Sequence, residues 1–218
     1  MQKIFSWNVA SIRARLPALT KLLTEESPDI VLLQEIKAEE SNFPFLNLKT
    51  LGYNAVICGQ KSYNGVAILA KNTITHVSAI SLIPNESPQA RFIQAQIGEI
   101  TFISVYVPNG NPPEKMPTDT TKLDYKLKWM KALNTHIQNL LAQHKNFVLG
   151  GDFNVIEYDS DVYNPELFRE NALMLPEVRQ LYSDLTHLPI TNAIRFKNPA
   201  PHTYSFWDFQ IFKLSIRL

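Results

Sequence analysis

The chain has 218 residues, of which 45% are hydrophobic and 19% are charged, and this balance is typical of a globular protein and excludes a disordered one. The net charge of +1 gives no global basic field, so any binding of nucleic acid must rest on local patches. A single cysteine, Cys58, excludes an internal disulfide and fits a reducing compartment. No apolar run approaches membrane-spanning length, and we expect a cytoplasmic protein that uses no membrane.

Apolar residues in the first part of the chain follow strand and helix spacings in turn. A buried strand is expected over residues 2–7, and a helix over residues 12–26, where leucines recur on one face. The Ser27-Pro28 pair is expected to end this helix, because a residue that precedes proline disfavours helical geometry. Residues 29–33 then form a short strand, whose continuous apolar run indicates burial on both faces.

The middle of the chain is rich in predicted strands separated by turn signals such as Asn64-Gly65. These strands are expected over residues 53–58, 65–70, 75–83, 91–97 and 101–107. A second helix follows over residues 121–142, then a buried strand over 147–151 and a third helix over 175–185. The pattern indicates an α/β fold with two stacked sheets covered outside by helices, rather than one doubly wound sheet. No repeat or linker marks a boundary, so we expect a single domain over residues 1–218.

The run Gly150-Gly151-Asp152-Phe153-Asn154 is the most informative stretch of the sequence. Side chains repeat their direction every second residue on extended backbone, so Asp152 and Asn154 can face one pocket. The two glycines let another backbone or a ligand approach this turn closely. A carboxylate beside a carboxamide suits phosphate ester chemistry with a hard divalent cation. The alternative is a strand end closed by an Asx turn.

Polar side chains also stand where the other buried strands end. They are Asn8 after the first strand, Gln34 and Glu35 after the second, and Tyr106 and Asn109 after the strand over 101–107. Strand ends on one edge of a sandwich converge in space, so these groups can line a single pocket. Taken singly, Asn8 could cap the following helix, Glu35 could be a solvated strand end, and Tyr106 could be a core aromatic. Together they predict a metal–phosphate site.

Several segments, in chain order, resemble the exonuclease III family of abasic-site endonucleases, within the endonuclease/exonuclease/phosphatase superfamily. They are 7–15 (WNVASIRAR), 33–37 (LQEIK), 64–68 (NGVAI), 91–92 (RF), 106–110 (YVPNG), 122–129 (KLDYKLKW), 150–154 (GGDFN), 161–165 (DVYNP) and 203–208 (TYSFWD). The resemblance implies a four-layered α/β sandwich, two stacked mixed sheets flanked by helices. It also implies an Mg²⁺-dependent, or Mn²⁺-dependent, DNA repair nuclease that acts as a monomer on double-stranded DNA, at abasic sites and 3′ ends.

The same resemblance implies roles by position. Glu35 is similar to the principal metal ligand, with Asn8 beside it, and a cation that keeps several waters needs only one or two protein carboxylates. Asp152 resembles the residue that orients or deprotonates the attacking water. Asn154 and Tyr106 resemble the groups that approach the scissile phosphate, where donors stabilise charge in the transition state.

Local positive charge and two aromatic residues supply the contacts to DNA that the resemblance implies. The residues assigned to DNA binding are Arg13, Lys37, Arg91, Lys126, Phe206 and Trp207. The cations would hold the backbone without reading sequence, and the aromatic pair would wall a pocket for a base-less sugar. The alternatives are a solvated surface charge for each lysine and a plain core pair for Phe206 and Trp207.

The sequence departs from the family pattern near its end. The family continues through an Arg-Ile-Asp segment to an Asp-His pair whose histidine contacts the scissile phosphate, whereas residues 209–218 contain no Asp, Glu or His. We therefore expect a C-terminally truncated member with its last strands missing, and loss of one such donor lowers the rate about a hundred- to thousandfold. The alternatives are an inactive DNA-binding remnant and, from another branch of the superfamily, a phosphodiesterase for other substrates.

Overall fold

The computed structural model describes residues 2–84, 86–115, 118–200 and 204–206. The chain divides into two compact units. The first unit comprises Met1–Pro108 and Thr135–Phe153, and the second comprises Asn109–Asn134 and Asn154–Leu218. That residues 1–218 act as a single domain stays a prediction.

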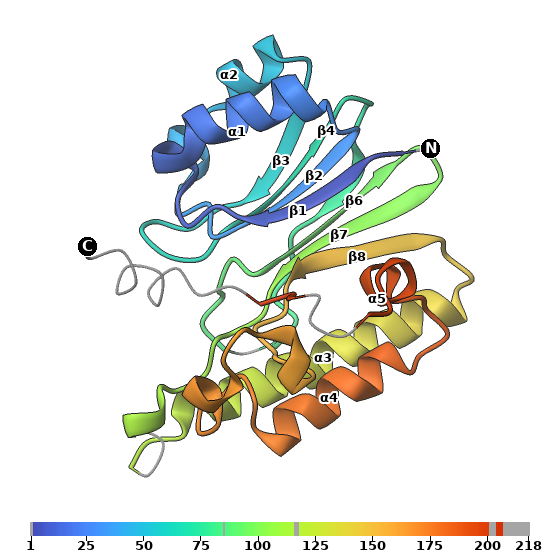
Figure 1. Cartoon of the computed structure of the whole chain (residues 1–218). Helices are drawn as coiled ribbons and strands as arrows, with labels where there is room; N and C mark the ends of the chain where they lie inside the picture. The colour runs from blue at the N-terminus through green and yellow to red at the C-terminus, as the bar shows by residue number, and fades with distance from the viewer. Residues whose placement is uncertain (1, 85, 116–117, 201–203, 207–218) are drawn as a thin grey trace. The chain divides into compact units, whose positions relative to one another are not determined.

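The first unit contains a four-stranded sheet in the order β1-β2-β4-β3. Its strands are β1 (Ile4–Asn8), β2 (Ile30–Gln34), β3 (Asn54–Cys58) and β4 (Val66–Ala70). Strand β1 pairs with β2 in parallel, while β4 is antiparallel to both of its neighbours (Figure 1). The parallel pairing brings the ends of β1 and β2 to the same edge of the sheet.

A second four-stranded sheet in the same unit has the order β5-β6-β7-β8. Its strands are β5 (Thr75–Ser78), β6 (Phe92–Ile97), β7 (Ile100–Tyr106) and β8 (Phe147–Asp152). Strands β5, β6 and β7 form an antiparallel meander, and β8 joins β7 in parallel. Each sheet is therefore mixed, with one parallel pair at its edge. The parallel pairing of β7 and β8 also brings their polar ends together.

Strand β2 shows how the sequence builds the layers. Ile30 and Leu32 pack into the core between the two sheets, with residues such as Phe102 from β7. Val31 and Leu33 point to the opposite face, into the core under the helices. Successive side chains of a strand alternate between faces, so a strand that is covered on both sides reads as a continuous apolar run.

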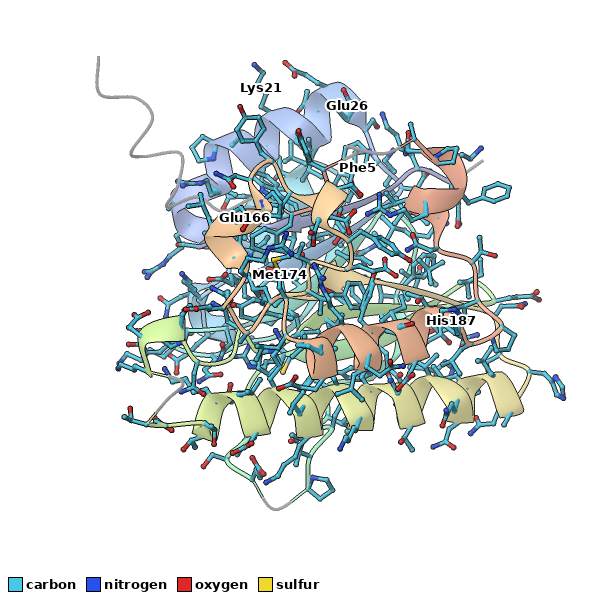
Figure 2. All side chains as sticks on the ribbon, turned by 60° about the horizontal axis from the view of Figure 1, so that its bottom comes forward. Phe5, Lys21, Glu26, Glu166, Met174 and His187 are labelled. Atoms are coloured by element: carbon cyan, nitrogen blue, oxygen red, sulfur yellow. The ribbon has the colours of Figure 1, made fainter. Side chains whose placement is uncertain are left out.

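Helices α1 (Ile12–Glu26) and α2 (Phe45–Thr50) cover the outer face of the first sheet (Figure 1). Ser11 begins α1, because its hydroxyl accepts a hydrogen bond from the Ala14 amide at 3.4 Å. The helix ends at Ser27, which adopts a left-handed conformation. Figure 2 shows Lys21 projecting from α1 away from the protein.

Helix α3 (Thr121–Ala142) contributes its first 14 residues to the second unit and the rest to the first. Within the first unit it packs on the second sheet, where His136 donates to or accepts from Gln94 at 2.8 Å and meets Phe92 edge-on. The second unit also contains α4 (Pro176–Thr186) and α5 (Ala193–Lys197).

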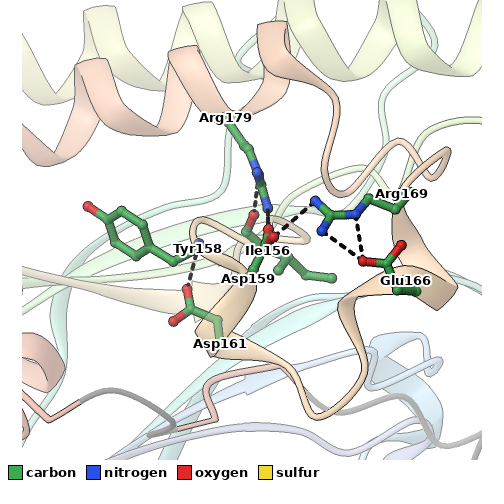
Figure 3. Close-up of polar contacts among 7 residues, drawn as sticks. All are labelled: Ile156, Tyr158, Asp159, Asp161, Glu166, Arg169 and Arg179. Atoms are coloured by element: carbon green, nitrogen blue, oxygen red, sulfur yellow. Dashed lines mark hydrogen bonds and ion pairs between the residues drawn. The ribbon is translucent and has the colours of Figure 1, made fainter.

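Ion pairs organise the loop that follows β8 in the second unit (Figure 3). The Asp159 carboxylate forms ion pairs with Arg169 and Arg179, each at 2.9 Å. Arg179 also donates a hydrogen bond to the Ile156 carbonyl at 2.8 Å. Arg169 pairs with Glu166 as well, at 2.8 Å. These contacts fix the course of the loop from residue 156 to the start of α4.

The expected α/β architecture of two stacked sheets with flanking helices is confirmed. The bounds of α1 and α3 are those expected, and most strands begin or end within one or two residues of their predicted ends. The strand expected over 75–83 is shorter, ending at Ser78, and the six-residue α2 and five-residue α5 were not predicted. No helix within the described ranges has the length and apolar character needed to cross a bilayer.

Candidate active site

An amide joins two carboxylates at the edge where β1, β2 and β8 end. The Nδ2 atom of Asn8 donates to Oε1 of Glu35 and to Oδ2 of Asp152, each at 2.8 Å. Its Oδ1 accepts from the Ala10 amide at 3.0 Å, which fixes the rotation of the side chain. The expectation that these three strand ends converge is correct, and Asn8 does not cap α1.

The two glycines of β8 explain how Asp152 reaches this position. A Cβ atom on Gly151, which has φ 153°, would lie 2.1 Å from the carbonyl oxygen of Val105. A Cβ on Gly150 would lie 2.6 Å from the side chain of Leu32 in the facing sheet. The contact at position 151 is with backbone, so only glycine fits there, whereas at position 150 the flexible end of the Leu32 side chain would have to shift to admit a Cβ atom. The pair therefore lets β8 lie tightly against both β7 and the other sheet, which carries Asp152 toward Asn8.

Glu35 is held as an ionised carboxylate. Burial disfavours its charge, but hydrogen bonds from Asn8 and Lys37, the charge of Lys37 and a hydrogen bond from Tyr106 outweigh burial, so the pKa of Glu35 lies below its usual value. The ion pair with Lys37 joins Nζ to Oε2 at 2.9 Å. Glu35 therefore presents a full negative charge beside Asp152 at neutral pH.

Tyr106 stands beside the carboxylates, at the end of β7. Burial, followed by the charge of Glu35, raises the pKa of Tyr106, so its hydroxyl stays protonated and can act as a donor. The guanidinium of Arg91 lies 4.7 Å from the centre of the Tyr106 ring, and it donates to the Tyr106 carbonyl at 3.2 Å. Arg91 therefore stacks on Tyr106 and brings positive charge to the site.

The donor set fits a hard divalent cation. Two carboxylate oxygens accept from one amide nitrogen, so two like charges lie close together, and a positive neighbour stabilises such a pair. Carboxylate and amide oxygens are the ligands that Mg²⁺ uses, together with water and phosphate oxygens. Within the ranges that the structure describes, no group of three or more His, Cys, Asp or Glu side chains could hold a metal. The sparse carboxylate pair is thus typical of a Mg²⁺ site completed by substrate rather than of a closed protein cage.

Lys126 lies in the second unit, and the prediction that it contacts DNA is wrong. Its side chain is 0% exposed, and Nζ donates to the carbonyls of Asn154 at 2.6 Å, Ala172 at 3.1 Å and Asn109 at 3.2 Å. A buried ammonium satisfied by backbone oxygens cannot reach a phosphate. Its position instead fixes the backbone of Asn154, a buried residue in the left-handed region at φ 48°.

The remaining residues predicted to bind DNA differ in their surroundings. Arg13 is exposed on the first turn of α1. Phe206 is half-buried and packs edge-on against Phe168, with ring centres 5.5 Å apart, at a small apolar core of the second unit. That contact favours the core alternative for Phe206 over a wall of a sugar pocket. Trp207 lies outside the described residues.

Two buried residues, Gln34 and Ser104, support the position of Glu35, and only Gln34 was singled out from the sequence. Gln34, directly before Glu35, donates through Nε2 to the Ser104 hydroxyl of β7 at 3.1 Å, and Ser104 donates to the Leu33 carbonyl at 3.2 Å. Both side chains are buried. These bonds tie the two sheets together one residue from Glu35. Gln34 stood out as a polar strand end, whereas nothing in the sequence distinguishes Ser104 from other serines.

Comparison with known proteins decides the family. Residues 5–211 match the model of the Endonuclease/Exonuclease/phosphatase family. The chain belongs to this family. It is 29% identical to exodeoxyribonuclease III from Haemophilus influenzae, over 95% of this chain and 80% of that protein. The expected membership among exodeoxyribonuclease III-like hydrolases, a group of metal-dependent DNA repair nucleases, is thereby confirmed.

Solved structures of family members agree with the fold described above. An AP endonuclease from Archaeoglobus fulgidus is 32% identical with a TM-score of 0.87, and the match covers 96% of this chain and 79% of that one. A 3′ phosphatase from Neisseria, bound to a product DNA hairpin, is 33% identical with a TM-score of 0.89, and the match covers 99% and 82%. These family members thus share the architecture of this chain over most of their length.

Proposed function

We propose that this protein hydrolyses phosphodiester bonds of double-stranded DNA at abasic sites and 3′ ends, as a monomer that uses Mg²⁺, with Mn²⁺ as a substitute. The observation that carries the proposal is the Asn8 amide bridging the Glu35 and Asp152 carboxylates at 2.8 Å. The relatives named as exodeoxyribonuclease III and AP endonuclease give the substrate class.

The site residues of the first unit then each have a role in catalysis that their surroundings favour. Asn8 and Glu35 would hold the cation, which when bound polarises a phosphate oxygen and lowers the pKa of a coordinated water. Asp152 accepts a proton from the attacking water, and its link to Asn8 fixes the carboxylate toward that water. The protonated Tyr106 hydroxyl, which donates to Glu35 in this structure, would turn to donate to the phosphate, while Arg91 holds the Tyr106 ring by stacking.

Residues outside this cluster complete the proposal. Asn154 would donate to the scissile phosphate, with its backbone held by Lys126. Arg13, exposed on α1, would bind a phosphate of the DNA backbone, and Arg91 would add charge closer to the reacting group. Lys126 acts as a positioning residue, and Trp207 keeps the role of lining the sugar pocket that the family resemblance implies.

The direct test incubates the full chain and Mg²⁺ with an end-labelled duplex that carries one abasic site, and resolves the products on a denaturing gel. We expect incision at the abasic site that EDTA abolishes. Glu35→Gln and Asp152→Asn should each lower the rate at least about a hundredfold, since each removes a group that acts in the transition state. Glu25→Gln, an exposed carboxylate on α1, is the matched control and should keep the wild-type rate.

Two results would contradict the proposal. Metal-independent cleavage would refute the Mg²⁺ site. No cleavage by the wild-type chain at high enzyme concentration would leave a DNA-binding protein without catalysis. Cleavage of a phospholipid headgroup but not of the abasic duplex would assign the site to another phosphodiesterase of the superfamily.

A further inference from the structure

The ion pair between Lys37 and Glu35 lies on the carboxylate that would hold the cation. Oε1 of Glu35 accepts from Asn8 at 2.8 Å, and Oε2 faces Lys37 Nζ at 2.9 Å. Both oxygens of this carboxylate therefore have a partner in the protein itself. The side chains of Lys37 and Glu35 are 33% and 20% exposed, so solvent and salt screen the pair less than one at the open surface.

The backbone around the pair is fixed by the fold. Glu35 and Lys37 both adopt left-handed conformations, at φ 50° and 49°, on either side of the fully buried Ile36. Ile36 N–H donates to the Gly65 carbonyl at 3.1 Å, and Lys37 N–H donates to the Asn64 carbonyl at 2.9 Å. Left-handed geometry is unfavourable for residues other than glycine, and it persists only where the surrounding structure imposes it. The meeting of the two side chains is thus set by the backbone.

We propose that Lys37 is a placeholder cation: in the metal-free protein its ammonium group pairs with the Glu35 carboxylate, and it competes with the divalent cation for that carboxylate. The proposal rests on the proposed function, which puts a cation at Glu35. A divalent ion needs the lone pairs of that carboxylate and repels a neighbouring ammonium. The flexible four-carbon stem of lysine lets the ammonium move away when the ion binds.

The ammonium group released from Glu35 would bind a phosphate of the DNA. A Mg²⁺ ion on one or two carboxylates takes further ligands from substrate phosphate, so phosphates come to the same place from which Lys37 departs. Lys37 thus changes partner from Glu35 to the DNA backbone. Removing its charge should therefore act in opposite directions, strengthening the binding of metal alone and weakening the binding of DNA. A lysine that merely oriented Glu35 would weaken metal binding when removed.

The test measures binding of Mn²⁺ alone to the full chain by titration calorimetry, without DNA, for the wild type, Lys37→Met, Lys37→Arg and Glu35→Gln. We expect Lys37→Met to bind Mn²⁺ about three- to tenfold more tightly, or ~0.7–1.4 kcal/mol. Lys37→Arg keeps the charge and should stay within about twofold of the wild type. Lys21→Met, which removes an exposed lysine from α1, is the matched control for net charge and should change nothing. Circular dichroism and the melting temperature report whether each variant is folded.

The outcomes separate the inference from the function on which it rests. If Glu35→Gln weakens Mn²⁺ binding but Lys37→Met leaves it equal or weaker, the placeholder role is wrong and the metal site stands. If neither the wild type nor Lys37→Met binds Mn²⁺ in a Glu35-dependent way, the metal site itself is refuted, and the placeholder with it. A second measurement uses fluorescence anisotropy of a labelled duplex, where Lys37→Met should weaken binding and reduce the salt slope by about one.

Discussion

Replacing Lys126 with methionine should destabilise the protein strongly, because it removes an ammonium from three buried acceptors. The carbonyls of Asn109, Asn154 and Ala172 would lose their donor, and a buried unsatisfied carbonyl costs about 1–3 kcal/mol. The gross loss is therefore roughly 3–9 kcal/mol. Methionine also avoids the burial of a charge, which offsets several kcal/mol. We expect a net loss of about 2–4 kcal/mol, and the melting temperature should fall by roughly 5–15 °C.

Urea unfolding followed by circular dichroism measures this change through the denaturant midpoint, with the slope compared between variants. Lys122→Met is the matched control, because Lys122 is an exposed lysine in the first turn of the same helix, and its stability should change by less than about 0.5 kcal/mol. A Lys126→Met variant as stable as this control would show that the three carbonyls do not depend on the ammonium. The account of how Asn154 is held would then be wrong.

Three further outcomes follow from the site. Gly151→Ala should destabilise the protein by about 2–4 kcal/mol in urea unfolding, since its Cβ would meet the Val105 carbonyl oxygen. Gly98→Ala should lose only about 1 kcal/mol, since it has positive φ but open space, and equal losses would refute the steric argument. Tyr106→Phe should lower kcat on the abasic duplex about tenfold or more with KM nearly unchanged, whereas a change in KM alone would exclude a donor that acts in the transition state. Because the folded-state pKa of Glu35 is depressed, its contribution to stability is present above its unfolded pKa of about 4.3 and disappears as pH falls through the lower folded pKa. Glu35→Gln should therefore flatten the loss of stability measured by unfolding between pH 5 and 3, and an unchanged pH profile would contradict the ionised state of Glu35.

Local sequence patterns determined the elements whose signals are long and periodic. Helices α1 and α3 begin and end where their apolar periodicity does, because each buries one continuous stripe of side chains. The buried strand β2 was recognised by its unbroken apolar run. The short helix α2 was missed, because six residues are too few to establish a helical period.

The candidate site shows the same division. The residue types at the ends of β1, β2 and β8 pointed to metal and phosphate chemistry, since strand ends on one edge must converge. The family motifs marked Lys126 and Lys37 as contacts to DNA, yet one is buried under three carbonyls and the other is paired with Glu35. Their environments depend on segments far away in the chain.

The sequence by itself determined the family of this protein, because the motifs around Asn8, Glu35 and Asp152 are short local patterns at strand ends. Only the tertiary structure decided which charged side chains lie at the candidate site and which bind the backbone elsewhere. The partners of Lys37 and Lys126 come from contacts between distant segments, and whether an ammonium group meets solvent, a carboxylate or a backbone carbonyl depends on how those segments pack.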